Sequence, residues 1–358
     1  MTTNIDNCKT LATVVSQGIN SPLGKNCEIT FARYSSCLAN FSELQINENA
    51  TVLISNIDDK NLFNLPENEK ITLLHPRNRK LLQIAVPALQ DCLKHLSDND
   101  KKSFGIPLFL GLPQEQSIAA SQEHQVLPAW IANISQIGID ITQSKTFSCG
   151  RASGIIAIEQ AIKYLNESGK KFALVGACDS MTDLGLLNGF DSEKRLISPK
   201  NSEGFIAGEA AVFFLITTAP IDDNAKITNF KAVICGEESA KRITFIDSAP
   251  LTLANMVAEL IEECGIENMK INTAYPSHNG EKEWLYEWGW CNHINRNHIN
   301  TSECQLELPT TFFGDTGAAD GLLKTAIAAD AIKKGVLKTP VLIASSSDYT
   351  HRGAMLIS

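Results

Sequence analysis

The sequence contains no long apolar run. Its longest uninterrupted stretch of apolar residues is Ala210 to Ile216, whereas about 20 such residues are needed to span a bilayer. The opening Met1-Thr2-Thr3-Asn4 also lacks the charged segment and the apolar segment that begin a secretory signal. We therefore expect a soluble, cytoplasmic protein without a membrane span.

The sequence also lacks a Cys-x-x-Cys pair, although it holds 10 cysteines. They are scattered from Cys8 to Cys304, which indicates free thiols in a reducing compartment rather than a disulfide framework. One cluster has potential metal ligands, but its spacing fits no common zinc module, so we predict a surface loop and neither a metal nor a cofactor. This cluster consists of Cys291, His293, His298 and Cys304.

Positive charge is in deficit. The 358 residues include 31 Lys and Arg against 40 Asp and Glu, a formal net charge of −9, which argues against nucleic-acid binding. With 44% hydrophobic and 20% charged residues, the composition is that of an ordinary globular protein.

Strands and helices are predicted to alternate. Residues 11–16 are expected to form a strand followed by a loop at 17–24, and residues 79–96 have helical spacing of apolar side chains, with Pro87 as a kink. A short apolar strand is expected at 106–110. This alternation favours an α/β sheet covered on both faces.

Two distant segments resemble each other. Cys149 to Gly154 opens a predicted helix that is followed by a strand at 172–177, and Asp315 to Gly321 opens a second helix that is followed by a strand at 341–344. Each predicted strand ends in a polar turn. The similarity indicates an internal duplication, although two ordinary crossover units of similar length would give the same pattern.

Small residues at both helix starts predict that the helices pack closely and point into one pocket. A helix N-terminus stabilises a nearby thiolate by about 0.3–2 kcal/mol. Cys149, at the first turn of its helix, is therefore the one cysteine placed for activation. The other nine cysteines are better explained as buried small apolar residues.

Four motifs in order resemble the β-ketoacyl synthases, the condensing enzymes of the thiolase superfamily. The loop Gly18 to Gly24 is similar to the family's Gly-x-x-Ser-Pro-Leu-Gly, and Phe147 to Gly154 resembles its nucleophile turn. Gly204 to Ala211 resembles its Gly-Phe-x-x-Gly-Glu-Gly-Ala strand, and Gly314 to Gly321 resembles its Gly-His-Thr-x-Gly-Ala-Ala-Gly turn.

The resemblance implies a thiolase-like α/β fold of five layers, αβαβα, with two duplicated halves. We place the halves at residues 1–220, which carry the nucleophile Cys149, and 221–358. The resemblance also implies an acyl-carrier protein or acyl-CoA as partner, and a homodimer or a heterodimer with a ketosynthase. The strand before the nucleophile, within 140–147, would then lie near the partner subunit.

The sequence departs from the family at three catalytic positions. Asp315 stands at the second histidine, Thr310 at the lysine, and Ser346 to Thr350 replaces a glycine-rich stretch. A carboxylate would repel a developing enolate, by about 4 kcal/mol at 4 Å and an effective dielectric near 20. Malonyl decarboxylation by the family's route is therefore doubtful.

His278 lies where the family has its first histidine and is the leading candidate for the base that serves Cys149. The alternatives are His351 and a merely structural histidine. Asp315 is expected to steady the imidazolium, and backbone N–H groups at Cys149 and near Asp348 to receive an oxyanion. Other residues expected at the pocket are Asp348, Tyr349, Thr310, Phe313 and His351.

Beyond His278, the sequence predicts an amphipathic helix. Trp284 and Trp288 are expected to pack inward, and Glu281, Glu283 and Glu287 to form a solvated face.

Two functions remain open at this point. One is an acyltransferase that forms a thioester on Cys149, with condensation doubtful. The other is a non-catalytic partner or scaffold of the chain-length-factor type, which would bind an acyl group or a carrier protein.

Overall fold

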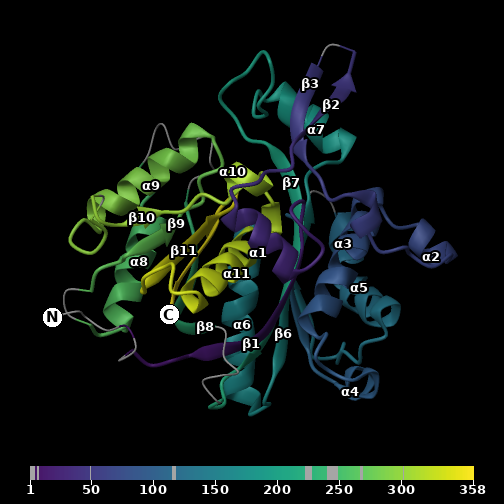
Figure 1. The fold of residues 1–358 in the computed structure, drawn as a ribbon, viewed down its shortest axis with the longest axis horizontal. Helices are drawn as coiled ribbons and strands as arrows, with labels where there is room; N and C mark the ends of the chain where they lie inside the picture. Colours follow the sequence, from purple (N-terminus) through teal and green to yellow (C-terminus); the bar gives the residue numbers. More distant parts are fainter. Residues whose placement is uncertain are drawn as a thin grey trace.

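The computed structural model describes residues 5, 8–48, 50–114, 118–221, 228–239, 249–266, 269–300 and 302–358. Figure 1 shows alternating layers of helix and sheet. No helix in these ranges is long and apolar enough to cross a membrane.

Two sets of five strands have the same topology. The strand order is β5-β4-β6-β7-β1 in the first set and β10-β9-β11-β12-β8 in the second. In each set the first three strands are parallel to one another, and each of the last two is antiparallel to the strand before it. In chain order, the members of the first set match those of the second one for one. The first set is β1 (Ala12–Asn20), β4 (Leu108–Gly111), β5 (Lys145–Phe147), β6 (Ala173–Ser180) and β7 (Ala207–Thr217). The second set is β8 (Thr228–Glu237), β9 (Thr273–Tyr275), β10 (Gln305–Leu306), β11 (Val341–Ser346) and β12 (His351–Ile357).

This identity of strand order and direction confirms the predicted duplication at the level of topology. The two sets are joined edge to edge, because residues 12–14 of β1 pair with residues 228–230 of β8.

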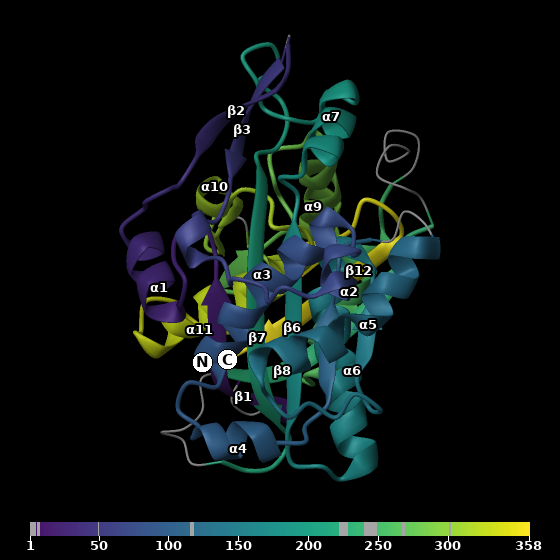
Figure 2. The same cartoon turned by 90° about the vertical axis from the view of Figure 1, so that its right-hand side faces the viewer.

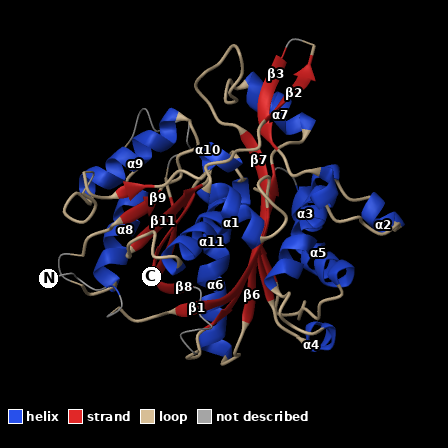
Figure 3. Ribbon diagram, in the orientation of Figure 1, coloured by secondary structure: helices blue, strands red, loops and turns tan. Residues whose placement is uncertain are grey.

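Helices fill three layers around the sheets (Figures 1 and 3). The first set is covered on its outer side by α3 (Pro76–Cys92) and α5 (Ile118–Ser135), and the second by α8 (Thr252–Glu263) and α9 (Lys282–Ile294). Between the sheets lie α6 (Ser153–Ser168) and α11 (Asp320–Lys333). The predicted five-layer thiolase-like arrangement is therefore confirmed.

The remaining elements are one hairpin, shorter helices and single turns. A hairpin of β2 (Ser42–Asn47) and β3 (Ala50–Ser55) projects beside α7 (Leu184–Ser192) (Figure 2). The other helices are α1 (Cys27–Ser35), α2 (Glu69–Thr72), α4 (Asp98–Ser103) and α10 (Thr310–Phe313). Single 3₁₀ turns are η2 (Asp59–Asn61), η3 (Gly150–Ala152) and η5 (Gly317–Ala319).

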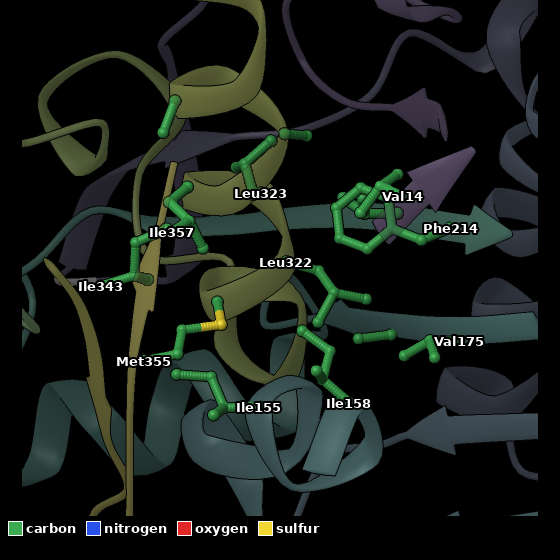
Figure 4. Close-up of a cluster of buried hydrophobic side chains, with 14 of the residues drawn as sticks. Val14, Ile155, Ile158, Val175, Phe214, Leu322, Leu323, Ile343, Met355 and Ile357 are labelled. Atoms are coloured by element: carbon green, nitrogen blue, oxygen red, sulfur yellow. The ribbon is translucent and has the colours of Figure 1, made fainter. Parts of the chain in front are cut away.

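The central helices cross closely because their contact faces are small or branched. Ile155 and Ile158 of α6 and Leu322 of α11 lie within one buried cluster, together with strand residues of both sets (Figure 4). A Cβ on Gly154 would stand 2.5 Å from Leu322 Cδ1 and 3.4 Å from the Ala318 carbonyl oxygen. Glycine at this position allows α6 to approach the start of α11.

Some predicted boundaries were wrong. β1 continues to Asn20, through part of the predicted loop, because Gly18 lets the strand lie against α3: a Cβ there would stand 2.1 Å from the Ala88 oxygen. The predicted helix at 79–96 begins at Pro76, which follows the capping His75, and ends at Cys92. Pro87 lies inside that helix.

Candidate active site

Cys149 lies at a tight turn between β5 and α6. It directly precedes η3, its side chain is half-buried, and Gly150 next to it has φ +71°. The Cys149 N–H donates to Ser153 Oγ (2.9 Å), and Ser153 Oγ donates to the Leu112 carbonyl (2.9 Å). The Cys149 N–H, which we expected to hold an oxyanion, is thus already a donor within the turn.

Ser347 ties this turn to the other half of the chain. Its hydroxyl donates to the Cys149 carbonyl and accepts from the Ala152 N–H (3.0 Å). The segment that contains Ser347 therefore holds the backbone of the Cys149 turn.

The second helix start is built in the same way. Asp315 lies between Gly314 (φ +68°) and Gly317 (φ +54°), and η5 leads into α11 as η3 leads into α6. Backbone hydrogen bonds fix Asp315 to β7: its N–H donates to the Ile206 oxygen (2.7 Å), and its oxygen accepts from Gly208 (2.9 Å).

Arg151 joins the two helix starts. This arginine is 3% exposed and Asp315 is 2% exposed. Its Nε and Nη2 donate to Asp315 Oδ2 at 2.8 and 2.5 Å, and its Nη1 donates to Asp348 Oδ1 at 2.6 Å. The two helix starts meet, and the side chain that reaches Asp315 from the first of them is Arg151, two positions after the cysteine.

A second arginine extends this buried network. Arg195 donates to both carboxylate oxygens of Glu281, at 2.7 and 3.0 Å, and to both oxygens of Asp348, at 2.9 and 3.1 Å. Asp348 therefore bridges Arg151 and Arg195. We call these five side chains the ion-pair network: Arg151, Arg195, Glu281, Asp315 and Asp348.

The network keeps its aspartates ionised. Burial alone would raise the pKa of Asp315, but the charge and hydrogen bonds of Arg151 and a hydrogen bond from Asn279 bring it below its ordinary value. The pKa of Asp348 is likewise lowered, since the charges of Arg151 and Arg195 outweigh its burial. An ionised carboxylate only accepts hydrogen bonds, so neither group is a proton donor near neutral pH.

Trp284 forms one wall of the network. Its Nε1 donates to Glu281 Oε2 (3.1 Å), and the guanidinium carbons of Arg151 and Arg352 lie 5.4 and 5.7 Å from its ring centroid. Arg352 in turn donates to Glu287 Oε1 at 2.5 Å. The aromatic face thus contacts two buried cations.

The solvated face predicted for Glu281, Glu283 and Glu287 was wrong for the first and the last of them, whereas Glu283 is partly exposed. Glu281 is 3% and Glu287 1% exposed, because each is paired with an arginine from another element. The inward packing of Trp284 and Trp288 is confirmed.

We expected Asp315 to hydrogen-bond to His278, but the hydrogen bonds of the two side chains are to other residues. Asp315 accepts from Asn279 Nδ2 at 2.7 Å, and the neighbouring His278 is half-buried, with its Nδ1 accepting from the Gly280 N–H at 3.4 Å. Burial and the charge of Lys324 lower the pKa of His278. The hydrogen bonds of the Asp315 carboxylate within the described residues thus come from Arg151, Asn279 and the Gly317 N–H, and none comes from His278.

The remaining predicted pocket residues are spread over several environments. Thr310 Oγ1 donates to the His278 carbonyl (2.9 Å), and Phe313 is fully buried, with its ring stacked at 5.7 Å on Tyr34. His351 lies on β12, with its Nδ1 3.5 Å from Glu237 Oε1. Of this group, Asp348 and Tyr349 line the cavity at the nucleophile turn.

Two adjoining cavities open beside the turn. The smaller, about 70 Å³, we call the elbow cavity, and the larger, about 350 Å³, the side chamber. They share Arg77, Gln114 and Leu186. The elbow cavity is further lined by Gly150, Arg151, Asp179, Met181, Phe190, Gly317, Asp348 and Tyr349.

The cysteine and histidine cluster at 291–304 has other contacts. Cys291 and Cys304 are buried, and His298 Nδ1 is 2.8 Å from the Met269 oxygen. In the part of the chain that the structure describes, no three His, Cys, Asp or Glu side chains are grouped as metal ligands.

Similarity to known proteins lies in the structure rather than in the sequence. No protein-family profile and no curated protein matches the sequence. Among solved structures, the ketosynthase from module 6 of the bacillaene synthase of Bacillus subtilis 168 matches with a TM-score of 0.77 and 13% identity, over 97% of this chain and 71% of that one. The chain has the ketosynthase fold.

Two further ketosynthase-fold structures match over nearly their whole length. One is a type II polyketide synthase ketosynthase complex with its acyl-carrier protein (TM-score 0.73, 11% identity, 97% of this chain and 98% of that one). The other is the ishigamide ketosynthase/chain length factor (TM-score 0.70, 13% identity, 98% and 99%). At these identities the likeness concerns the fold alone.

Sequence reasoning missed Arg151, Arg195 and Asn279. The sequence did contain a signal for Arg151. It is a charged residue in a turn of otherwise small residues, and the second turn, 314–321, contains the charged Asp315. A charge introduced in each of two packed turns indicates that they pair. Arg195 gave no comparable signal.

Proposed function

We propose that the protein is a ketosynthase-fold acyltransferase that carries an acyl group as a thioester on Cys149 and does not decarboxylate malonyl units. The observation that carries the proposal is that the half-buried Cys149 lies at a glycine-assisted turn, two residues before Arg151, which pairs with Asp315.

The chemistry is thioester exchange. The Cys149 sulfur attacks the carbonyl carbon of an acyl thioester, the carbon–sulfur bond of the donor breaks, and the departing thiolate takes up the proton that Cys149 lost. The start of α6 favours a thiolate at this place, whereas the Arg151 charge is already paired with Asp315 and Asp348.

Decarboxylation would require hydrogen-bond donors aimed at an enolate oxygen. Asp315 is held ionised and only accepts, and Arg151 and Asn279 donate to Asp315 itself. Acyl loading forms no enolate, so the absence of these donors does not prevent it, which is why the proposal stops at transfer.

His278 remains our candidate base. Its lowered pKa, due to burial and Lys324, leaves the ring neutral at pH 7 and therefore able to accept the thiol proton. The variant His278→Gln should slow loading below pH 8 and lose less at high pH, where the thiol ionises without help.

A second candidate function is a non-catalytic partner of a ketosynthase. The observation that favours it is the small elbow cavity, about 70 Å³, because pockets for small ligands usually measure about 300–1,000 Å³. In this case the ion-pair network would serve as a filled, rigid core at the former site.

Loading of Cys149 separates the two functions. The protein is incubated with acetyl-CoA, or with an acyl-carrier protein bearing an acyl group, and its intact mass is measured. Cys149→Ala should abolish the adduct, whereas Cys37→Ala, which removes an exposed thiol away from the site, should retain it. No adduct on Cys149 with either donor would favour the scaffold.

For partners we propose a carrier protein and a second ketosynthase-fold chain. β5 is an outermost strand of the described sheet, so one of its edges is open to another strand. Light scattering should give twice the mass of one chain for a homodimer, and a single-chain mass would point to a separate ketosynthase partner.

A further inference from the structure

A histidine that lines the side chamber contacts a serine behind it. His124 Nδ1 is 2.8 Å from Ser148 Oγ, within hydrogen-bonding distance. The His124 ring is 4% exposed, lines the side chamber, and is carried by α5. Ser148 is half-buried and immediately precedes Cys149.

Rigid elements bring these two side chains together. Leu127 and Ile131, three and seven residues after His124, anchor the same face of α5 in the core below β4 and β6. Ser148 follows the last residue of β5, at the carboxyl ends of the parallel strands β4, β5 and β6. In open α/β sheets ligands bind at this edge.

We propose that Ser148 is a second nucleophile, with His124 as its base, and that it accepts short acyl groups from esters or thioesters that enter the side chamber. This activity goes beyond the function proposed for Cys149 and does not require that thiol.

The proposed step balances within the pair. Ser148 Oγ attacks the acyl carbon while its proton passes to His124 Nδ1, and the bond from the acyl carbon to the leaving oxygen or sulfur then breaks. The leaving group takes the proton from His124. The products are a serine ester and a free alcohol or thiol.

The side chamber fits a short acyl chain. Its volume of about 350 Å³ lies at the lower end of ligand pockets. The apolar Ala119, Ala120 and Leu186 line part of its wall, and the rest is polar or charged, including Gln114, Arg77, Glu123 and Asp183. Gln114 also lines the elbow cavity next to Gly150. Its carboxamide is our candidate donor to the oxyanion.

The test uses full-length Cys149→Ala protein, so that no thioester at that position contributes. It is treated with an alkyl fluorophosphonate and, separately, with p-nitrophenyl acetate, and the modified residue is identified by peptide mass spectrometry. Both reagents should modify Ser148. The acetyl group should survive neutral hydroxylamine, which cleaves thioesters.

Two matched variants in the same background test the pair. Ser148→Ala should abolish labelling of that peptide. His124→Asn keeps an oxygen that can accept the serine hydroxyl but cannot take its proton, so the labelling rate should fall about 100-fold. Unchanged labelling in His124→Asn, or modification only at other residues, would overturn the proposal.

A folding control keeps the result interpretable. Each variant must unfold within a few degrees of the parent in a thermal melt. If Cys149→Ala does not fold, the wild-type protein with Cys149 blocked by iodoacetamide takes its place. Absence of label at Ser148 in that protein would also refute the pair.

Discussion

Arg151 is the residue on which the buried charges of the site depend. Its guanidinium contacts two carboxylates and the face of Trp284, and nearly all of it is shielded from water. A buried pair as a whole adds little net stability, but the removal of one member leaves an uncompensated charge.

We therefore expect Arg151→Met to destabilise the protein by about 3–5 kcal/mol. The double variant Arg151→Met/Asp315→Asn should recover part of that loss, because the orphaned carboxylate is gone. Urea unfolding of both single variants and the double variant measures the coupling. Strictly additive effects of the two substitutions would show that the pair does not interact.

Asp348 predicts an acid-dependent loss of stability. Its folded pKa lies below its ordinary value of about 3.9, so its contribution is present above about pH 4 and is lost as the pH falls through the folded pKa. Unfolding free energies from pH 7 to pH 2 should show the wild type converging on Asp348→Asn at the acid end.

The comparison with Asp348→Asn also removes the contribution of other titrating groups to the pH dependence, because both proteins contain them. Glu287, whose pKa is raised by burial despite Arg352, titrates in both proteins. A constant gap between the two profiles at all pH values would contradict the role given to the Asp348 charge.

At the scale of elements, the start of α11 is held by Gly317. This residue has φ +54°, and a Cβ there would stand 2.0 Å from Asp179 Oδ2. Asp179 cannot easily move, because it accepts from the Ala318 N–H (2.9 Å) and from Arg77 (2.6 Å).

Gly317→Ala should therefore cost about 1–3 kcal/mol more than a positive φ alone. Gly335→Ala is the matched control, since that glycine follows the other end of the same helix at φ +69°, and no atom of the described residues lies within 4 Å of where its Cβ would stand. Thermal melts compare the two. Equal losses would mean that the contact with Asp179 is not what requires glycine.

Residue patterns predicted elements well where local chemistry decides them. The two helix starts were predictable because runs of small residues are typical of closely packed helix ends. The strand after each helix was predictable from its run of apolar residues. β1 was cut short because Gly18 suggests a turn, whereas only the position of α3 reveals that the glycine serves packing.

Charges were predicted less well because their partners are remote. Glu281, Trp284 and Glu287 are spaced three residues apart, so in the structure both glutamates lie on the same buried side of α9 as Trp284. Their arginine partners lie 86 and 65 positions away in sequence. Without those partners, solvent exposure was the natural interpretation.

At the scale of the whole molecule, neither half can bury its central helix alone. α6 and α11 share one core with strands of both sets, and β1 pairs with β8 across the division. The proposed boundary at residues 220 and 221 therefore separates units of common topology rather than independent folding units.

This gives a test with two fragments. Residues 1–220 and 221–358, produced separately, should each be insoluble or lack a cooperative melt, and should form a folded complex when produced together. Circular dichroism and co-purification measure the outcome. A cooperative transition in either fragment alone would show that its own contacts suffice.

The Ser347 hydroxyl holds the backbone of the turn that carries Cys149. It forms hydrogen bonds to the backbone on both sides of Gly150, although Ser347 lies 198 residues after Cys149 in the chain. Exchange of this one small side chain for alanine would remove both hydrogen bonds, and so loosen the backbone of the Cys149 turn without altering the thiol itself.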